Sequence, residues 1–219
     1  MKFYTKEVLA SINNPNITVV AATKYFNAEE MRELYNTGLT NFGENRVERL
    51  LEMQEKLADL KITWHLIGTL QTKKAKKIIN TIDYLHSLDT IKLASEIQKR
   101  RTEKLKCFIQ VNISSEESKH GLSPKEVIPF IKELLPMDKI EVIGLMGMAE
   151  LTSDEAVINQ EFQKLNDLQE AIKKALNLNL KELSIGMSND YLIALKHNAT
   201  FLRLGSVLFS SIRFMNGGQ

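Results

Sequence analysis

Ile17-Thr-Val-Val-Ala-Ala-Thr23 and the Asn27-Ala-Glu-Glu30 that follows it form the stretch of sequence that decides the fold. The first segment is a short apolar run typical of a buried strand. Asn27 with Glu30 three residues later forms a capping box, which predicts that a helix begins there. Strand and helix are joined by only a few residues, which is the form of a β–α unit.

The same order, a short apolar run and then an amphipathic stretch, recurs to the end of the chain. After the first strand, further strands are predicted at residues 40–43, 64–67, 83–88, 107–113, 141–146, 183–186 and 201–204. Helices are predicted at about 46–57, 72–80 and 90–102, from the capping sequence Ser123-Pro-Lys-Glu126, along the apolar positions between Val157 and Leu176, and after each of the last two strands. Many of the strands are apolar on both faces, as a parallel sheet requires.

Eight strand–helix pairs predict an α/β fold of the (β/α)₈ TIM-barrel type. The chain of 219 residues is short for this fold, so its loops must be short. An open doubly wound sheet is the alternative, but no Gly-x-Gly-x-x-Gly sequence follows the first strand. No linker, low-complexity segment or internal repeat is visible, so residues 1–219 are expected to form a single domain.

Composition excludes several classes of protein. The chain is 43% hydrophobic and 26% charged, as soluble domains are, and its net charge of +2 gives no reason to expect nucleic acid or a membrane as a partner. No uncharged apolar stretch approaches the ~20 residues that span a bilayer, and the N-terminus lacks the apolar core of a signal peptide. The single cysteine, Cys107, lies in an apolar run and is expected to be a buried, inert thiol. We therefore expect a cytoplasmic protein without disulfides.

In a barrel of this kind, the active face lies at the C-terminal ends of the strands. The first strand leads to Lys24, whose stem could simply pack while its ammonium reaches solvent, or whose amine could form a Schiff base with an aldehyde. The second strand leads to Asn45, which is either a helix cap or a site residue. The third contains His65, either a hydrogen-bonded barrel residue or a ligand contact. The lysine-rich segment 71–77 is either a solvated helix face or an RNA or anion contact.

The strongest signal for a ligand lies at the ends of the last two strands. The seventh strand leads into Gly186-Met-Ser188 and the eighth into Arg203-Leu-Gly-Ser206, with helices predicted straight after both turns. Free backbone N–H groups at such turns bind phosphate, and this is the usual phosphate site of the fold. The alternative is that the serines cap helices and Gly205 makes a tight turn. Serine in both turns, with an arginine beside one of them, favours phosphate.

Seven blocks of the sequence together resemble the pyridoxal phosphate homeostasis proteins, the single-domain relatives of the alanine racemase barrel. They span residues 17–209, nearly the whole chain, and stand in family order. The blocks are Ala22-Thr-Lys24, Phe42-Gly-Glu-Asn45, Trp64-His-Leu-Ile-Gly68 with Leu70-Gln71, Val111-Asn-Ile-Ser-x-Glu-x-Ser-Lys119, Gly144-Leu-Met146, Leu183-Ser-Ile-Gly-Met-Ser-Asn-Asp190 and Leu204-Gly-Ser206.

The resemblance implies pyridoxal 5′-phosphate (PLP) as the cofactor, held as a Schiff base on Lys24. It further implies that Ser188, Gly205 and Ser206 bind the phosphate. Arg203 is implied to face the pyridine nitrogen, as the corresponding arginine does in alanine racemase. Asn45 and His65 are further candidates for cofactor contacts, and no metal site is expected.

The chain departs from the family pattern at three points, none of which touches the predicted cofactor pocket directly. Lys73-Lys74 stands where the family often has Asn-Lys, and Phe26 stands where it commonly has a lysine two places beyond the Schiff-base lysine. The segment before the first strand is short and leaves room for one short N-terminal helix.

The role that the resemblance implies is PLP homeostasis: a carrier that keeps the cofactor available and sequestered, without a dedicated reaction of its own. PLP-dependent apoenzymes are then the expected protein partners, and a monomer is expected, with a dimer as the alternative. Two other functions stay open: a PLP-dependent amino-acid racemase, and a barrel enzyme acting on a phosphorylated metabolite. A racemase needs a proton donor on each face of a carbanion. Besides Lys24, only Tyr25 and Tyr191 among the tyrosines lie near predicted strand ends.

Overall fold

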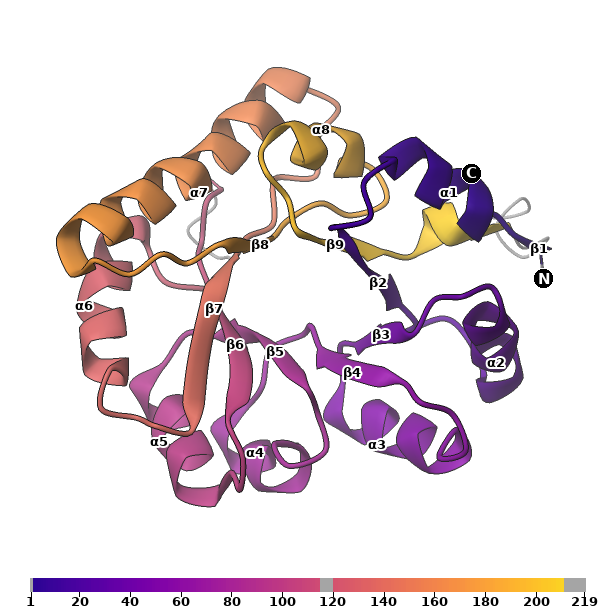
Figure 1. The fold of residues 1–219 in the computed structure, drawn as a ribbon, viewed down its shortest axis with the longest axis horizontal. Helices are drawn as coiled ribbons and strands as arrows, with labels where there is room; N and C mark the ends of the chain where they lie inside the picture. Colours follow the sequence, from indigo (N-terminus) through magenta and orange to yellow (C-terminus); the bar gives the residue numbers. More distant parts are fainter. Residues whose placement is uncertain (1, 115–119, 211–219) are drawn as a thin grey trace.

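The computed structural model describes residues 2–114 and 120–210 of the chain. Eight parallel strands hydrogen-bond in sequence order and close into a barrel, and helices surround the ring (Figure 1). The barrel strands are β2 (Thr18–Ala22), β3 (Asn41–Glu44), β4 (Thr63–Leu66), β5 (Tyr84–Leu88), β6 (Leu105–Gln110), β7 (Ile140–Met146), β8 (Glu182–Ser184) and β9 (Phe201–Leu204). Strand β9 closes the ring on β2, with Arg203 opposite Val20. The predicted TIM barrel is confirmed.

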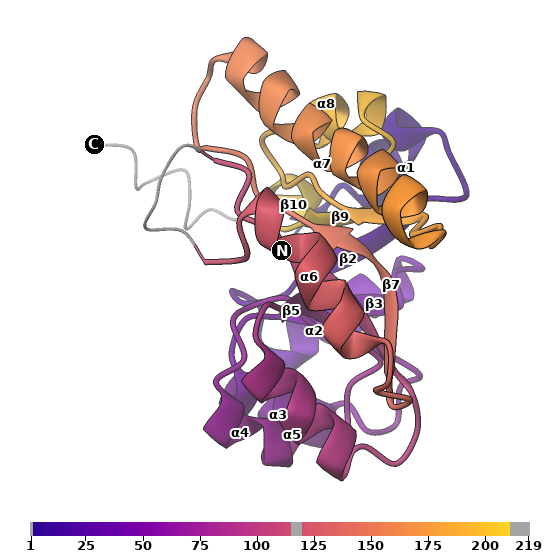
Figure 2. The same cartoon turned by 90° about the vertical axis from the view of Figure 1, so that its left-hand side faces the viewer.

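The helices cover the outside of the barrel, where they bury the outward-facing apolar side chains of the strands. Figures 1 and 2 show α7, α8 and α1 on one side of the barrel, and α3, α4 and α5 on the opposite side. The helices are α1 (Thr5–Ile12), α2 (Ala28–Asn36), α3 (Val47–Lys56), α4 (Thr72–Ile78), α5 (Ile91–Arg100), α6 (Pro124–Leu134), α7 (Glu155–Leu176) and α8 (Tyr191–Lys196).

The predicted helix after the eighth strand is wrong. Strand β9 is followed by a single 3₁₀ turn, η1 (Ser206–Leu208), and by the short strand β10 (Phe209–Ser210), which pairs antiparallel with β1 (Lys2–Phe3). In the apolar run Val207-Leu-Phe209, the first two residues lie in η1 and Phe209 is extended, and the Leu208 carbonyl accepts from Tyr4 N–H at 2.9 Å. The short N-terminal helix predicted before the first strand is present as α1, and it occupies the place in the outer ring between α8 and α2 (Figure 1).

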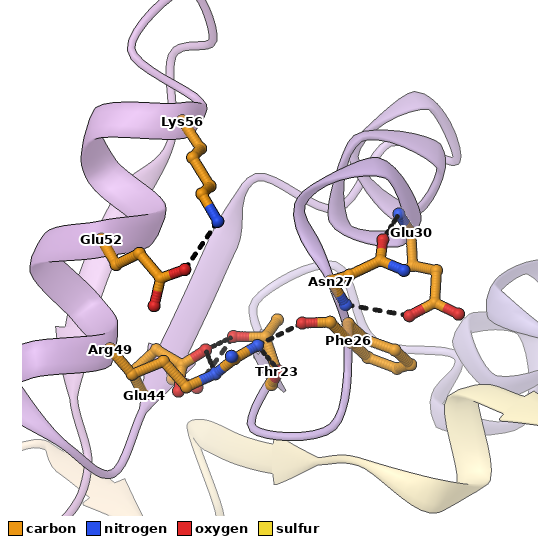
Figure 3. A network of polar contacts seen from close by, with 9 residues as sticks. Thr23, Phe26, Asn27, Glu30, Glu44, Arg49, Glu52 and Lys56 are labelled. Atoms are coloured by element: carbon orange, nitrogen blue, oxygen red, sulfur yellow. Dashed lines mark hydrogen bonds and ion pairs between the residues drawn. The ribbon is translucent and has the colours of Figure 1, made fainter.

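The two predicted capping boxes are confirmed, because local hydrogen bonds alone decide them. The Asn27 side chain accepts from Glu30 N–H, and Glu30 accepts in return from Asn27 N–H, both at 2.9 Å (Figure 3). Glu126 accepts likewise from Ser123 N–H at 2.8 Å.

The ends of strands depend less on local sequence than helix caps do. The seventh strand ends at Ser184 rather than at the predicted Gly186, because Gly186 has a φ of +89°, which a strand does not allow.

The interior of the barrel combines an aromatic core with a set of buried polar side chains. Tyr84 and His86 are two residues apart on β5, as are Phe201 and Arg203 on β9, and this spacing puts both members of a pair on one face of a strand. His65, His86, Ser184 and Arg203 are all at most 5% exposed. Inside a barrel, such polar groups must find their hydrogen bonds among themselves.

The structure also bears on expectations drawn from composition. Cys107 is fully buried in β6, as expected, and burial raises the pKa of its thiol. Among the described residues, no helix is both long enough and apolar enough to cross a bilayer.

Candidate functional site

A pocket of about 320 Å³ opens at the C-terminal ends of β2, β7, β8 and β9. Its lining residues include Lys24, Tyr25, Ser188, Arg203, Gly205 and Ser206. This is the barrel end at which the fold presents its functional loops, and the volume lies within the range of small-molecule sites.

Lys24 lies on the turn between β2 and α2, at the edge of this pocket. Its side chain is exposed, and its Nζ lies 4.7 Å from the centroid of the Tyr25 ring. The ammonium is therefore already held beside an aromatic face at the pocket mouth rather than buried in an apolar wall.

The backbone on both sides of Lys24 is fixed by a buried carboxylate and an arginine (Figure 3). Thr23 Oγ1 donates to Glu44 Oε1 at 2.6 Å, and Arg49 Nε donates to the same oxygen at 3.3 Å. Arg49 Nη2 also donates to the carbonyl oxygens of Thr23, at 3.3 Å, and of Phe26. Burial raises the pKa of the Glu44 carboxyl, while the hydrogen bond from Thr23 and the charge of Arg49 oppose that rise. The clamp limits how far the Lys24 turn can move.

The turn after β8 depends on a glycine. A Cβ on Gly186 would lie 2.7 Å from the Ala194 Cβ and 2.8 Å from the Leu202 Cδ2, and its φ of +89° is in the left-handed region. Only glycine fits there without strain. Met187 N–H donates to Asp190 Oδ1 at 2.5 Å, which closes the turn and carries Ser188 to the pocket.

Two backbone donors from the turn after β9 converge on Ser188. Its Oγ accepts from the N–H of Gly205 at 3.1 Å and from the N–H of Val207 at 3.3 Å. The Ser188 oxygen therefore lies where the N–H groups of Gly205 and Val207 converge. Anions bind at such convergent backbone N–H groups. The two turns expected from the sequence to bind phosphate therefore lie in direct contact.

Arg203 lies on the pocket wall and is held tightly. Its Nη1 donates to the carbonyl and to the Oγ of Ser184, both at 2.6 Å, and its Nη2 donates to the Gly147 carbonyl at 3.0 Å. Burial lowers the pKa of the guanidinium to about 10, and the nearby charge of Asp190 opposes that shift. At neutral pH, Arg203 therefore stays cationic and acts only as a hydrogen-bond donor.

Some predicted site residues do not reach this pocket. Asn45 is exposed and lines a neighbouring cavity, which it shares with Lys24. His65 lies inside the barrel, where both ring nitrogens are already hydrogen-bonded. On α4, Lys73 is exposed and Lys74 pairs with Glu48 at 2.8 Å. Lys119 lies outside the described residues.

Sequence reasoning missed three parts of the site. These are the loop after β7, which brings Ala149 to Thr152 to the pocket, the side chain of Asp190, and the clamp of Glu44 with Arg49. A signal existed for one of them, because Glu44 is a charged residue at the end of a strand that is otherwise buried. A carboxylate there requires a partner.

Comparisons with known proteins agree with one another. The model of the alanine racemase N-terminal domain family matches residues 8–212. The pyridoxal phosphate homeostasis protein of Aquifex aeolicus is 36% identical over 199 residues, which cover 90% of this chain and 87% of that protein. PipY of Synechococcus elongatus, solved with PLP bound, has a TM-score of 0.83 and 31% identity, over 93% of this chain and 99% of that one.

More distant structures share the fold alone. An alanine racemase of Clostridium difficile has a TM-score of 0.77 at 12% identity, and the match covers 94% of this chain but 56% of the racemase. The barrel is therefore common to both groups, whereas the close sequence similarity is to the shorter proteins. The chain belongs to the alanine racemase N-terminal domain family and, within it, to the pyridoxal phosphate homeostasis proteins.

Proposed function

We propose that this protein binds PLP as a Schiff base on Lys24 and serves intracellular PLP homeostasis. One observation carries the proposal. Lys24 with its primary amine, Ser188, on whose hydroxyl the backbone N–H groups of Gly205 and Val207 converge, and Arg203 with its fixed guanidinium all line a single pocket. These are the three kinds of group that an aldehyde, a phosphate and a pyridine nitrogen require.

The residues present fit PLP at each of its three polar ends. Ser188 Oγ accepts from the N–H groups of Gly205 and Val207, and its own O–H would donate to a phosphate oxygen. Ser206 adds a hydroxyl at the same edge of the pocket. Arg203 would hold the ring nitrogen as a donor, and Lys24 would reach the aldehyde. When bound, PLP supplies an electrophilic carbonyl conjugated to an electron-withdrawing ring.

The role in homeostasis rests on the relatives. The A. aeolicus protein bears the name pyridoxal phosphate homeostasis protein, and PipY has been solved with PLP bound. A protein that stores and releases PLP has PLP-dependent apoenzymes as its natural recipients, and these are the partners that we propose.

The phosphate assignment is tested by removing one hydroxyl. We expect Ser188→Ala to weaken PLP binding by about 1.5–3 kcal/mol, because a donor to an anionic group is lost. Equilibrium titration followed by absorbance measures the change. Ser95→Ala, at an exposed position on α5, is the matched control and should bind like the unmodified protein. Pyridoxal without its phosphate should bind far more weakly than PLP. Equal affinity for pyridoxal and PLP would show that these turns do not bind the phosphate.

The protein is expected not to racemise amino acids efficiently. Lys24 and Tyr25 lie side by side, with Nζ 4.7 Å from the ring centroid, so both would approach a bound ring from one side. The Tyr191 hydroxyl lies 3.1 Å from Ser11 Oγ on α1. L-Alanine with the PLP-loaded protein in deuterated water should show inversion far below the median enzyme rate of about 10 s⁻¹. Rapid loss of optical rotation, abolished by Tyr25→Phe or Tyr191→Phe, would show that the protein is a racemase.

A further inference from the structure

Arg203 is the first member of a hydrogen-bonded chain that runs through the barrel. Ser184 Oγ, which accepts from Arg203 at 2.6 Å, lies 2.8 Å from His86 Nδ1. His86 Nε2 lies 3.0 Å from His65 Nδ1, and His65 Nε2 lies 3.0 Å from Asn41 Oδ1. Four strands, β9, β8, β5 and β4, supply the links, and Asn41 on β3 ends the chain.

Aromatic rings shield this hydrogen-bonded chain of side chains from solvent. His65 and His86 are both 0% exposed. The His65 ring is stacked on Tyr84 at 4.4 Å between centroids, and the His86 ring lies 4.5 Å from that of Phe108. No salt-bridging carboxylate contacts either imidazole among the described residues, and burial lowers the pKa of both. Both rings are therefore neutral, so each carries one N–H and one acceptor nitrogen.

The Asn41 end of this hydrogen-bonded chain fixes the direction of every hydrogen bond in it, and the Arg203 end is consistent with that direction. At one end the amide oxygen of Asn41 can only accept, so His65 Nε2 carries the proton and His65 Nδ1 accepts. His86 Nε2 must then donate, and His86 Nδ1 must accept from the hydroxyl of Ser184. At the other end the guanidinium of Arg203 can only donate, and the same hydroxyl oxygen accepts from it. Every group is satisfied once, in a single direction.

We propose that Ser184, His86 and His65 are positioning residues that hold Arg203 in one orientation toward the ligand pocket. Each of the three side chains accepts one hydrogen bond and donates another to the next member, so the hydrogen-bonded chain leaves no freedom to turn the guanidinium away. The inference rests on the proposed function in one respect, because the ligand atom that Arg203 meets is taken to be the pyridine nitrogen of PLP.

The first test needs no cofactor. Nitrogen-15 NMR of the ligand-free protein reports the tautomer of each imidazole. Both His65 and His86 should be neutral Nε2–H tautomers throughout the range from about pH 5 to 8. A protonated ring, or an Nδ1–H tautomer at either residue, would overturn the directed chain. This result stands whether or not the protein binds PLP.

The second test breaks one link and keeps the volume. Ser184→Ala removes the hydroxyl but leaves Arg203 its two carbonyl acceptors. The matched control is Ser87→Ala, because Ser87 is 1% exposed and its hydroxyl donates to the Gly68 carbonyl at 2.8 Å rather than to a member of the hydrogen-bonded chain. In the PLP-loaded protein, Ser184→Ala should shift the pH midpoint of the cofactor absorbance by about 0.5 unit or more. It should also weaken PLP binding by roughly three- to tenfold.

The outcomes are separable. Identical spectra, midpoints and affinities for the two serine variants would overturn the positioning role. If Ser184→Ala does not fold, the tautomer measurement on the unmodified protein decides the matter. If the unmodified protein does not bind PLP, the proposed function fails, and the hydrogen-bond direction is still judged by the tautomers.

Discussion

Lys24→Ala is expected to abolish the yellow colour of the PLP-loaded protein completely, because Lys24 is the one lysine that lines the pocket in the described part of the chain. The fold should survive. Lys24 is exposed and contributes its ammonium to the Tyr25 face rather than to the core, so the free energy of unfolding should change by no more than about 0.5 kcal/mol. Absorbance spectra and thermal unfolding of the same sample measure both expectations.

Two controls sharpen this result. Lys24→Arg keeps the charge over Tyr25 but supplies no amine for a Schiff base, so it should be as colourless as the alanine variant. Lys73→Ala, at an exposed position on α4, should stay fully yellow. A Lys24→Ala protein that binds PLP with its normal spectrum would show that the amine lies elsewhere.

The stability of the ligand-free protein is expected to fall steeply as the pH is lowered from 7 toward 4.5. Burial lowers the pKa of His65 to about 3 and lowers that of His86 well below its ordinary value. In the unfolded chain both titrate near 6.5, so between these values the unfolded state binds more protons and is favoured as pH falls. Each histidine removes up to about 1.4 kcal/mol per pH unit below 6.5.

A variant isolates this contribution from that of the buried carboxyls. Burial raises the pKa of Glu44, Asp89 and Asp190, which acts in the opposite direction and offsets part of the loss. His65→Phe keeps a ring against Tyr84 and should lose roughly half of the histidine contribution to the pH slope in urea unfolding between pH 6.5 and 4.5. His120→Asn, at an exposed position, should keep the slope. An unchanged slope in His65→Phe would mean that His65 is not buried in its neutral form.

The sequence predicts those parts of the structure that local chemistry decides. The capping boxes at Asn27 and Ser123 formed as expected, since their donors and acceptors are three residues apart. The order of the eight strands also followed, because each apolar run is bounded by helix signals. The described residues after Leu204 do not form the expected helix. Phe209 and Ser210 are extended because they pair with Phe3 and Lys2, which are about two hundred residues away in the chain.

Only part of the site could likewise be predicted from the sequence. Strand ends must meet at one face of a parallel barrel, so Lys24, Ser188 and Arg203 could be expected to come together. The positions of the His65 and Asn45 side chains could not be predicted, because a shift of one residue turns a strand side chain from the inside of the barrel to the outside. The clamp on the Lys24 turn needs Arg49, a residue of α3 whose reach to the Phe26 carbonyl depends on packing between neighbouring units.

Locating the attachment point of PLP tests the assignment of Lys24 most directly. The PLP-loaded protein is reduced with borohydride, digested, and its peptides are mapped by mass spectrometry. We expect one modified peptide, which contains Thr23-Lys24-Tyr25, in close to one copy per chain. A label on Lys119 or on the lysines at 73–77, with the Lys24 peptide unmodified, would contradict it.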